Sequence, residues 1–172
     1  MSSTDETYRV YAVKYAFHER RSSANFLGGD IHDVPSPLDY FVWAVIGPSR
    51  VFIVDTGFSQ DMATKRGRQI THPVEQGLAR IGIDASRVQD VIVTHMHYDH
   101  AGNRELFPNA RYHIQDREMA YCTGRCMCHA ALNQPFEVAD VSLMVNRIFD
   151  GRVQFHDGDA SITAGLSVHL VG

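Results

Sequence analysis

Residues 95–100, HMHYDH, bring three imidazole side chains and one carboxylate into a run of six positions. Imidazole nitrogen and carboxylate oxygen are ligands that Zn²⁺ accepts, and a catalytic zinc ion keeps one position open for water. In an extended segment alternate side chains point to the same side, so His95, His97 and Asp99 can converge while His100 projects differently. The spacing therefore predicts a metal site in which one short loop serves two ions. The alternative is a polar loop with surface histidines.

The segments around this motif predict strands that hold it in place. Residues 91–94, VIVT, are all β-branched, which is typical of a strand buried on both faces, and they lead directly into the motif. Upstream, the β-rich runs 39–46 and 50–55 flank residues 47–49, Gly-Pro-Ser, which predicts a hairpin whose second strand ends in Asp55. We therefore expect the histidines at the end of a strand.

Strands and helices alternate along the rest of the chain, which predicts an α/β fold. At 172 residues, the chain is expected to form a single domain, residues 1–172. The other expected elements are a strand at 8–17, a loop at 18–37, helices at 73–81, 101–107 and 116–131, and strands at 111–114, 152–156 and 166–171.

Residues 94–103, THMHYDHAGN, together with 54–57, VDTG, resemble the metallo-β-lactamase superfamily. The resemblance covers most of residues 38–118 and continues more loosely to the end of the chain. It implies an αββα sandwich, of which this chain holds mainly the N-terminal part. The resemblance is strongest to the N-acyl homoserine lactonase branch, on residues 39–46, the spacing of the two motifs and the sequence DHAGN.

The resemblance also implies a role for each motif residue. His95 and His97 would hold one zinc ion, Asp99 and His100 a second, and Asp55 would orient a histidine ligand. The implied enzyme is a zinc-dependent hydrolase that opens a lactone or similar ester with a hydroxide bridging the two metals, because metal coordination lowers the pKa of water towards about 7.

Two further residue roles follow from this expected reaction. Asp99 would act in catalysis by carrying a proton to the leaving oxygen. Tyr98, beside the ligands, would line the substrate pocket or act only as a packing aromatic. The alternative functions are a thioesterase of the glyoxalase II type and an inactive fragment with an incomplete metal site.

The family's remaining ligands, two histidines and an aspartate, would follow a strand like the one at 165–168. That alignment places the first of them just beyond Gly172, and His169 lies too early to replace it. We therefore expect this chain to lack three ligands. A missing C-terminal part would leave one sheet face uncovered, which favours association, for example as a homodimer.

The resemblance implies a small-molecule ester or lactone as the partner, and composition argues against nucleic acid and membrane. The net charge is −4 with dispersed Lys and Arg, so nucleic acid is not expected, and no apolar run approaches the roughly 20 residues of a membrane helix. The N-terminus lacks a secretory pattern, which predicts a cytoplasmic protein. Three cysteines between Cys122 and Cys128 are expected as thiols, with a structural zinc site that includes His129 as the alternative.

Overall fold

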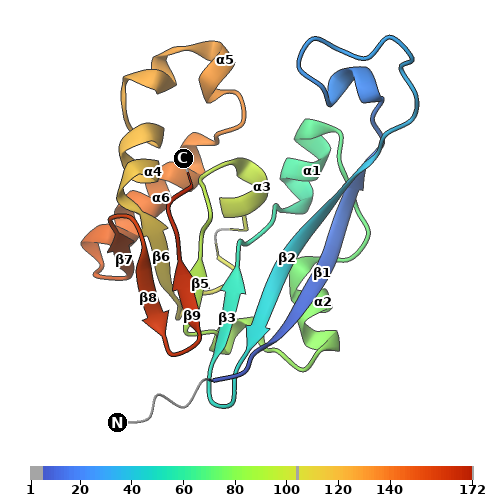
Figure 1. Ribbon diagram of the computed structural model, residues 1–172. Coiled ribbons are helices and arrows are strands. Elements are labelled where there is room, and N and C mark those ends of the chain that lie inside the picture. The colour runs from blue at the N-terminus through green and yellow to red at the C-terminus, as the bar shows by residue number, and fades with distance from the viewer. Residues whose placement is uncertain (1–5, 104, 172) are drawn as a thin grey trace.

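The computed structural model describes residues 6–103 and 105–171. A seven-stranded sheet, ordered β4-β1-β2-β3-β5-β6-β7, runs through it, and β8 and β9 form a second sheet (Figure 1). The strands are β1 Arg9–His18, β2 Leu38–Ile46, β3 Val51–Val54, β4 Gln69–Ile70, β5 Asp90–Ile92, β6 Arg111–Gln115, β7 Val153–His156, β8 Ala160–Thr163 and β9 Leu166–Val168. The helices are α1 Gln60–Arg66, α2 Val74–Arg80, α3 Tyr98–Ala101, α4 Asp116–Cys122, α5 Ala130–Asn133 and α6 Val138–Phe149. The predicted α/β class is confirmed.

The large sheet is antiparallel on one side and parallel on the other. β1, β2 and β3 pair antiparallel, and the predicted hairpin between β2 and β3 is present, since Gly47 N–H donates to the carbonyl of Arg50. β3, β5, β6 and β7 pair parallel. The carboxyl ends of parallel strands meet at one edge of a sheet, where loops form binding sites. Asp55 and the motif at 95–100 both lie at this edge.

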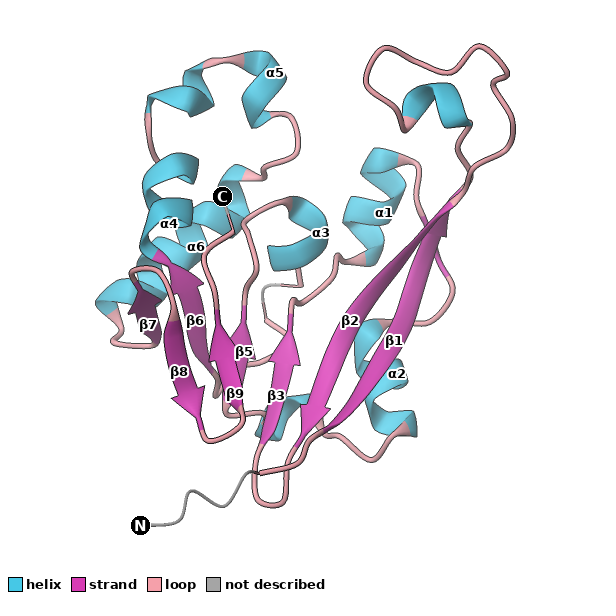
Figure 2. Ribbon diagram, viewed as in Figure 1, coloured by secondary structure: helices cyan, strands magenta, loops and turns pink. Residues whose placement is uncertain are grey.

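The two faces of the large sheet are covered differently. On one face, the helices bury the main core, which includes Ala63 of α1, Leu78 of α2 and Met144 of α6 (Figure 2). On the other face, the β8–β9 hairpin packs against a small cluster made of Val45, Phe52 and Ile92, with Ile162, Leu166 and Val168 against it. The described residues therefore form a helix layer, a sheet layer and a two-stranded layer.

The β8–β9 hairpin leaves part of its side of the sheet open. Val10 on β1 and Trp43 on β2 share the face of Val45 in the β1–β2 register, yet they are 60% and 43% exposed. An incompletely covered sheet face was expected from the sequence. That a second copy of the chain covers this face stays a prediction.

The prediction of a helix at 101–107 is wrong. The helical turn lies earlier, as α3 within the motif itself, and ends at Ala101. The backbone N–H groups of Gly102 and Asn103 both donate to the carbonyl of Gly57, at 2.9 and 3.0 Å, instead of continuing the helix. A contact with the distant β3–α1 loop therefore overrides the local helical pattern.

The helix expected at 116–131 is interrupted. α4 ends at Cys122, where the hydroxyl of Thr123 donates to the carbonyl of Met119, and a 3₁₀ turn over Arg125–Cys128 separates it from α5. The strand expected at 166–171 also ends earlier, at Val168, because Leu170 N–H donates to the side chain of Asp159.

The loop expected at 18–37 is a structured arm that extends beyond the ends of β1 and β2 (Figure 1). The side chains of Arg21 and Asp33 form an ion pair at 2.5 Å, which ties its two sides together. None of the described helices is long and apolar enough to cross a membrane.

Candidate metal centre

The four side chains expected to bind metal lie together at the carboxyl end of β5. The ring of His95 lies 4.4 Å from the ring of His97 and 3.9 Å from that of His100, measured between centroids. Nε2 of His100 lies 3.5 Å from a carboxylate oxygen of Asp99. Within residues 6–103 and 105–171, however, no three His, Cys, Asp or Glu side chains are arranged to hold one ion by themselves. The motif therefore presents pairs of donors rather than a full ligand set.

Asp55 connects the end of β3 to the motif. It is 4% exposed and has a φ of 63°, a left-handed conformation that few residues other than glycine adopt and that is often found at functional sites. One carboxylate oxygen accepts hydrogen bonds from the backbone and hydroxyl of Thr94 at 2.8 and 2.9 Å. The other lies 2.7 Å from Nδ1 of His100. This contact uses Nδ1 and leaves Nε2 of His100 for another partner.

Distant elements fix the backbone of the motif. The amide and hydroxyl of Thr56 donate to the carbonyl of His100 at 2.7 and 3.1 Å. The buried hydroxyl of Tyr15, on β1, donates to the carbonyl of Asp99 at 3.1 Å. The backbone amide of Met96 donates to the carboxylate of Glu118 at 2.6 Å. Neither Tyr15 nor Glu118 was predicted from the sequence, since neither lies in a motif. Thr56 follows Asp55 in the motif VDTG, so a sequence signal for it was present.

The surroundings give the three histidines different protonation behaviour. Burial, helped by the neighbouring histidines, lowers the pKa of His95 to about 4, so its ring is neutral near pH 7. Burial also lowers the pKa of His97. Burial opposes the charged form of His100 too, but hydrogen bonds to Asp55 and Asp99 outweigh it and raise the pKa to about 9. Burial would raise the pKa of Asp99, but the hydrogen bond from His100 and the charge of its ring outweigh burial and lower this pKa.

Tyr98 lies within the motif, and its side chain is buried, since the residue is only 6% exposed. Its ring lies between Phe58, at 5.5 Å between centroids, and the guanidinium of Arg66, 4.0 Å above it. Its hydroxyl accepts a hydrogen bond from Arg68 at 3.1 Å and lies 3.4 Å from the hydroxyl of Tyr40. These contacts describe a packing role, and contact with a substrate stays a prediction.

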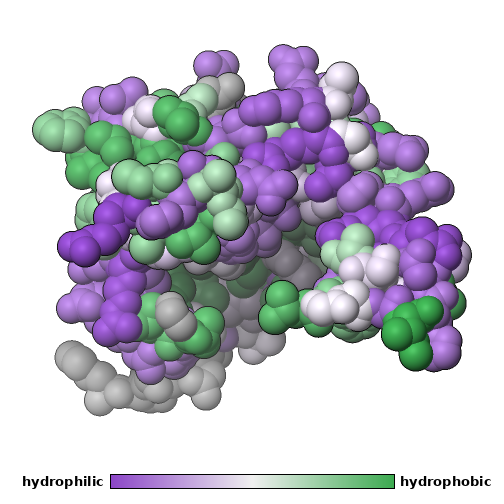
Figure 3. All heavy atoms as spheres, turned by 90° about the horizontal axis from the view of Figure 1, so that it is seen from above, coloured by the Kyte–Doolittle hydropathy of each residue, from purple (hydrophilic) through white to green (hydrophobic). Residues whose placement is uncertain are grey.

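A cavity of about 510 Å³ adjoins His95, and its lining includes Glu118, Tyr121 and His169. His169 thus lies on the same cavity as a motif histidine. Its two ring nitrogens already face other groups, the carboxylate of Asp159 at 3.0 Å and the hydroxyl of Ser167 at 2.9 Å. Figure 3 looks onto this end of the molecule, where hydrophilic side chains predominate and hydrophobic ones form separate groups.

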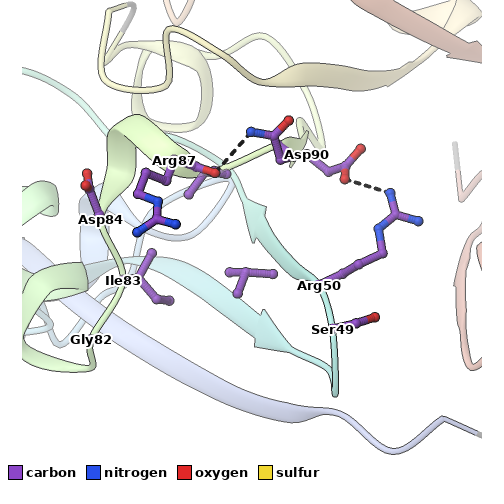
Figure 4. Close-up of a pocket in the computed structure, with 10 residues that line it drawn as sticks. Ser49, Arg50, Gly82, Ile83, Asp84, Arg87 and Asp90 are labelled. Carbon is purple, nitrogen blue, oxygen red and sulfur yellow. Dashed lines mark hydrogen bonds and ion pairs between the residues drawn. The ribbon is translucent and has the colours of Figure 1, made fainter.

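A second cavity, of about 540 Å³, lies at the amino ends of β3 and β5, opposite the motif (Figure 4). Arg50 and Asp90 form an ion pair at 2.7 Å on its wall. The opposite carboxylate oxygen of Asp90 lies 3.2 Å from Nε2 of buried His113. None of the residues predicted for the site lines this cavity, so it has no part in the metal centre.

The alternative zinc site on the cysteines has no support in the structure. Cys122, Cys126 and Cys128 are free cysteines in the structure, and their oxidation state stays a prediction. Cys122 is buried, whereas Cys128 is exposed. Together with His129 they form no metal-holding group in the part of the chain that the structure describes.

Comparison with known families now adds to this geometry. Residues 35–165 match the family model described as the metallo-beta-lactamase superfamily, which is most of the chain and includes the whole motif. The chain belongs to the metallo-beta-lactamase superfamily. This membership confirms the resemblance seen in the sequence and the predicted fold family. No curated protein sequence matches the chain.

Several solved structures share the fold. A probable metal-dependent hydrolase from Staphylococcus aureus aligns with a TM-score of 0.68 and 14% identity, over 97% of this chain and 64% of its own. AidC, a dizinc quorum-quenching lactonase, aligns with a TM-score of 0.67 and 15% identity, over 90% of this chain and 60% of its own. An AiiA mutant from B. thuringiensis, with N-decanoyl-L-homoserine bound, aligns with a TM-score of 0.56 and 18% identity, over 93% of this chain and 63% of its own. At these identities the likeness establishes the fold alone, and the chain spans less than two thirds of each structure.

Proposed function

We propose that this chain provides ligands for a two-zinc centre in a hydrolase that opens a lactone or similar ester. The observation that carries the proposal is the meeting of His95, His97, Asp99 and His100 at the carboxyl end of β5. Membership of the metallo-beta-lactamase superfamily supports it, as do structural neighbours of this chain that include a protein described as a probable metal-dependent hydrolase and a dizinc lactonase. A cytoplasmic location and a small-molecule substrate are part of the same proposal.

The donor chemistry of these residues fits zinc. His95 and His97 would hold one ion, and both rings have lowered pKa values, so each offers a nitrogen lone pair near neutral pH. Asp99 and His100 would hold the other, with the carboxylate of Asp99 ionised and Nε2 of His100 directed away from Asp55. Because the pKa of His100 is about 9, its ring is protonated near pH 7 and would release the proton on Nε2 when zinc binds. Each pair supplies two of the four ligands that zinc takes, so water or further protein ligands must complete each ion.

A bound zinc ion supplies an activated water and polarises a carbonyl, which are the two requirements of ester hydrolysis. The chain's own residues provide orientation and proton transfer. Asp55 holds the ring of His100 in one orientation through Nδ1. In the proposed reaction Asp99, whose carboxylate is 20% exposed, would carry a proton to the leaving oxygen.

The test is a substrate panel on the purified, zinc-loaded protein. We expect hydrolysis of N-acyl homoserine lactones, measured by the protons that ring opening releases. We expect little hydrolysis of a glutathione thioester. The variant His97→Ala should abolish the lactone activity, while His129→Ala, which changes an exposed histidine outside the site, should leave it unchanged. Thioester hydrolysis without lactone opening would replace the lactonase proposal by the thioesterase. Activity that survives His97→Ala would remove the site from the reaction.

A further inference from the structure

Glu118 reaches from α4 to the centre of the metal-binding motif. Its Oε1 accepts a hydrogen bond from the backbone amide of Met96 at 2.6 Å, across 22 positions of sequence. Met96 stands between His95 and His97, and its own side chain is fully buried in the main core. The carboxylate therefore holds the His95–Met96 peptide unit, one of the two peptide units that link the two histidines.

The hydrogen bond between Glu118 and Met96 is not the one that a glutamate at this position of a helix usually makes. Glu118 is the third residue of α4, where a glutamate commonly reaches back to the N-cap backbone and closes a capping box. In this protein the N-cap, Gln115, makes no side-chain capping bond, and the carboxylate bonds Met96 instead. Burial raises the pKa of Glu118, and the hydrogen bond from the backbone amide of Met96 opposes this rise because it stabilises the ionised carboxylate.

The geometry of an extended segment explains what the bond achieves. His95 and His97 project to the same side only while the backbone between them stays extended. A short hydrogen bond from an amide to a carboxylate is roughly twice as strong as one to a neutral acceptor. Glu118 and His95 also line the same cavity, so no other side chain layer separates the carboxylate from the motif.

We propose that Glu118 is a positioning residue of the metal centre, which fixes the backbone at Met96 so that His95 and His97 face the same ion. This inference rests on the metal-binding role proposed above. It assigns Glu118 no direct contact with the metal or with the substrate.

The test compares zinc affinity, measured by competition with a chromogenic chelator, in four variants of the whole chain. Glu118→Ala removes the acceptor, Glu118→Asp keeps the charge but shortens the reach, and Glu118→Gln keeps an acceptor oxygen at the same reach. Asp116→Ala is the matched control, because it removes an exposed carboxylate from the same first turn of α4. Visible absorption of the cobalt(II)-loaded variants reports the ligand geometry, and thermal unfolding without metal reports the fold.

We expect Glu118→Ala and Glu118→Asp to weaken zinc binding by roughly 10- to 100-fold and to change the cobalt spectrum. Glu118→Gln should weaken it by no more than about threefold, and Asp116→Ala should match the wild type. If Glu118→Ala does not fold, the difference in zinc affinity between Glu118→Asp and Glu118→Gln tests the inference in its place. Variants that lose thermal stability but keep the affinity and the spectrum would overturn the inference alone. A wild-type chain that binds no zinc would overturn the proposed function, and the inference with it.

Discussion

The carboxylate of Asp55 lies 2.7 Å from Nδ1 of His100, although the two residues stand 45 positions apart in the chain. β3 ends at Val54, and β5 leads into the motif, so parallel pairing of these strands brings the two residues together. The contact fixes which nitrogen of His100 faces the other donors. It also explains why a buried aspartate keeps a left-handed backbone, because that conformation directs its carboxylate to Thr94 and His100 at once.

Replacing Asp55 by Asn tests this contact. Asparagine tolerates the left-handed backbone, but its amide cannot accept hydrogen bonds through both terminal atoms. We expect Asp55→Asn to stay folded and to bind zinc about tenfold more weakly, as measured by chelator competition. Asp61→Asn, on an exposed position of α1, should bind as the wild type does. Equal affinities in both variants would show that Asp55 does not orient His100.

The hydroxyl of Tyr15 supports the motif from β1. Tyr15→Phe removes the donor to the carbonyl of Asp99 and leaves that carbonyl short of a partner. We expect the free energy of unfolding to fall by about 1 kcal/mol, which lowers the melting temperature by about 2–4 °C in a chain of this size. Tyr121→Phe removes a hydroxyl from an exposed ring and should leave the melting temperature unchanged. A Tyr15→Phe variant as stable as the wild type would contradict the prediction.

The ion pairs of Glu137 make stability depend on pH. Glu137 joins α6 to α1 through Lys65, at 2.8 Å, and Arg66, at 2.7 Å. Burial alone would raise its pKa, but the hydrogen bonds from Lys65 and Arg66 outweigh burial and lower it. A carboxyl whose pKa is lower in the folded state stabilises the fold above its unfolded pKa, about 4.3, and loses this contribution as the pH falls through the lowered value.

We therefore expect Glu137→Gln to reduce the free energy of unfolding by about 1–2 kcal/mol at pH 7. The difference from the wild type should shrink as the pH falls below about 4, as measured by urea unfolding. Glu75→Gln, on an exposed position of α2, provides the control. A difference that stays constant with pH would mean that the charge of Glu137 is not what stabilises the fold.

The sequence predicted the parts of the site that local patterns encode. The strand ending at Ile92 is visible in a run of β-branched residues, and the ligand types are visible in residues 95–100. Asp55 was identified because residues 54–57, VDTG, resemble a family motif directly after the neighbouring strand. In each case the information lies within a few positions of the residue itself.

The rest depends on contacts between distant segments. Glu118 is one acidic residue in an unremarkable helix, and only the packing of α4 against the motif gives it a role. Gly102 ends a helix because of a bond to Gly57, which no local pattern shows. α6 is different, because Val141, Met144, Val145 and Ile148 recur at helical spacing, so its pattern was available and was not used.

The most direct test of the central claim is the zinc content per chain, by elemental analysis after loading and removal of excess metal, with an intact mass beside it. We expect about two zinc ions per chain in the wild type, a lower content in His97→Ala and in His100→Ala, and no change in His129→Ala. Zinc content that is negligible in the wild type, or equal in all four proteins, would contradict the claim that residues 95–100 form the metal centre.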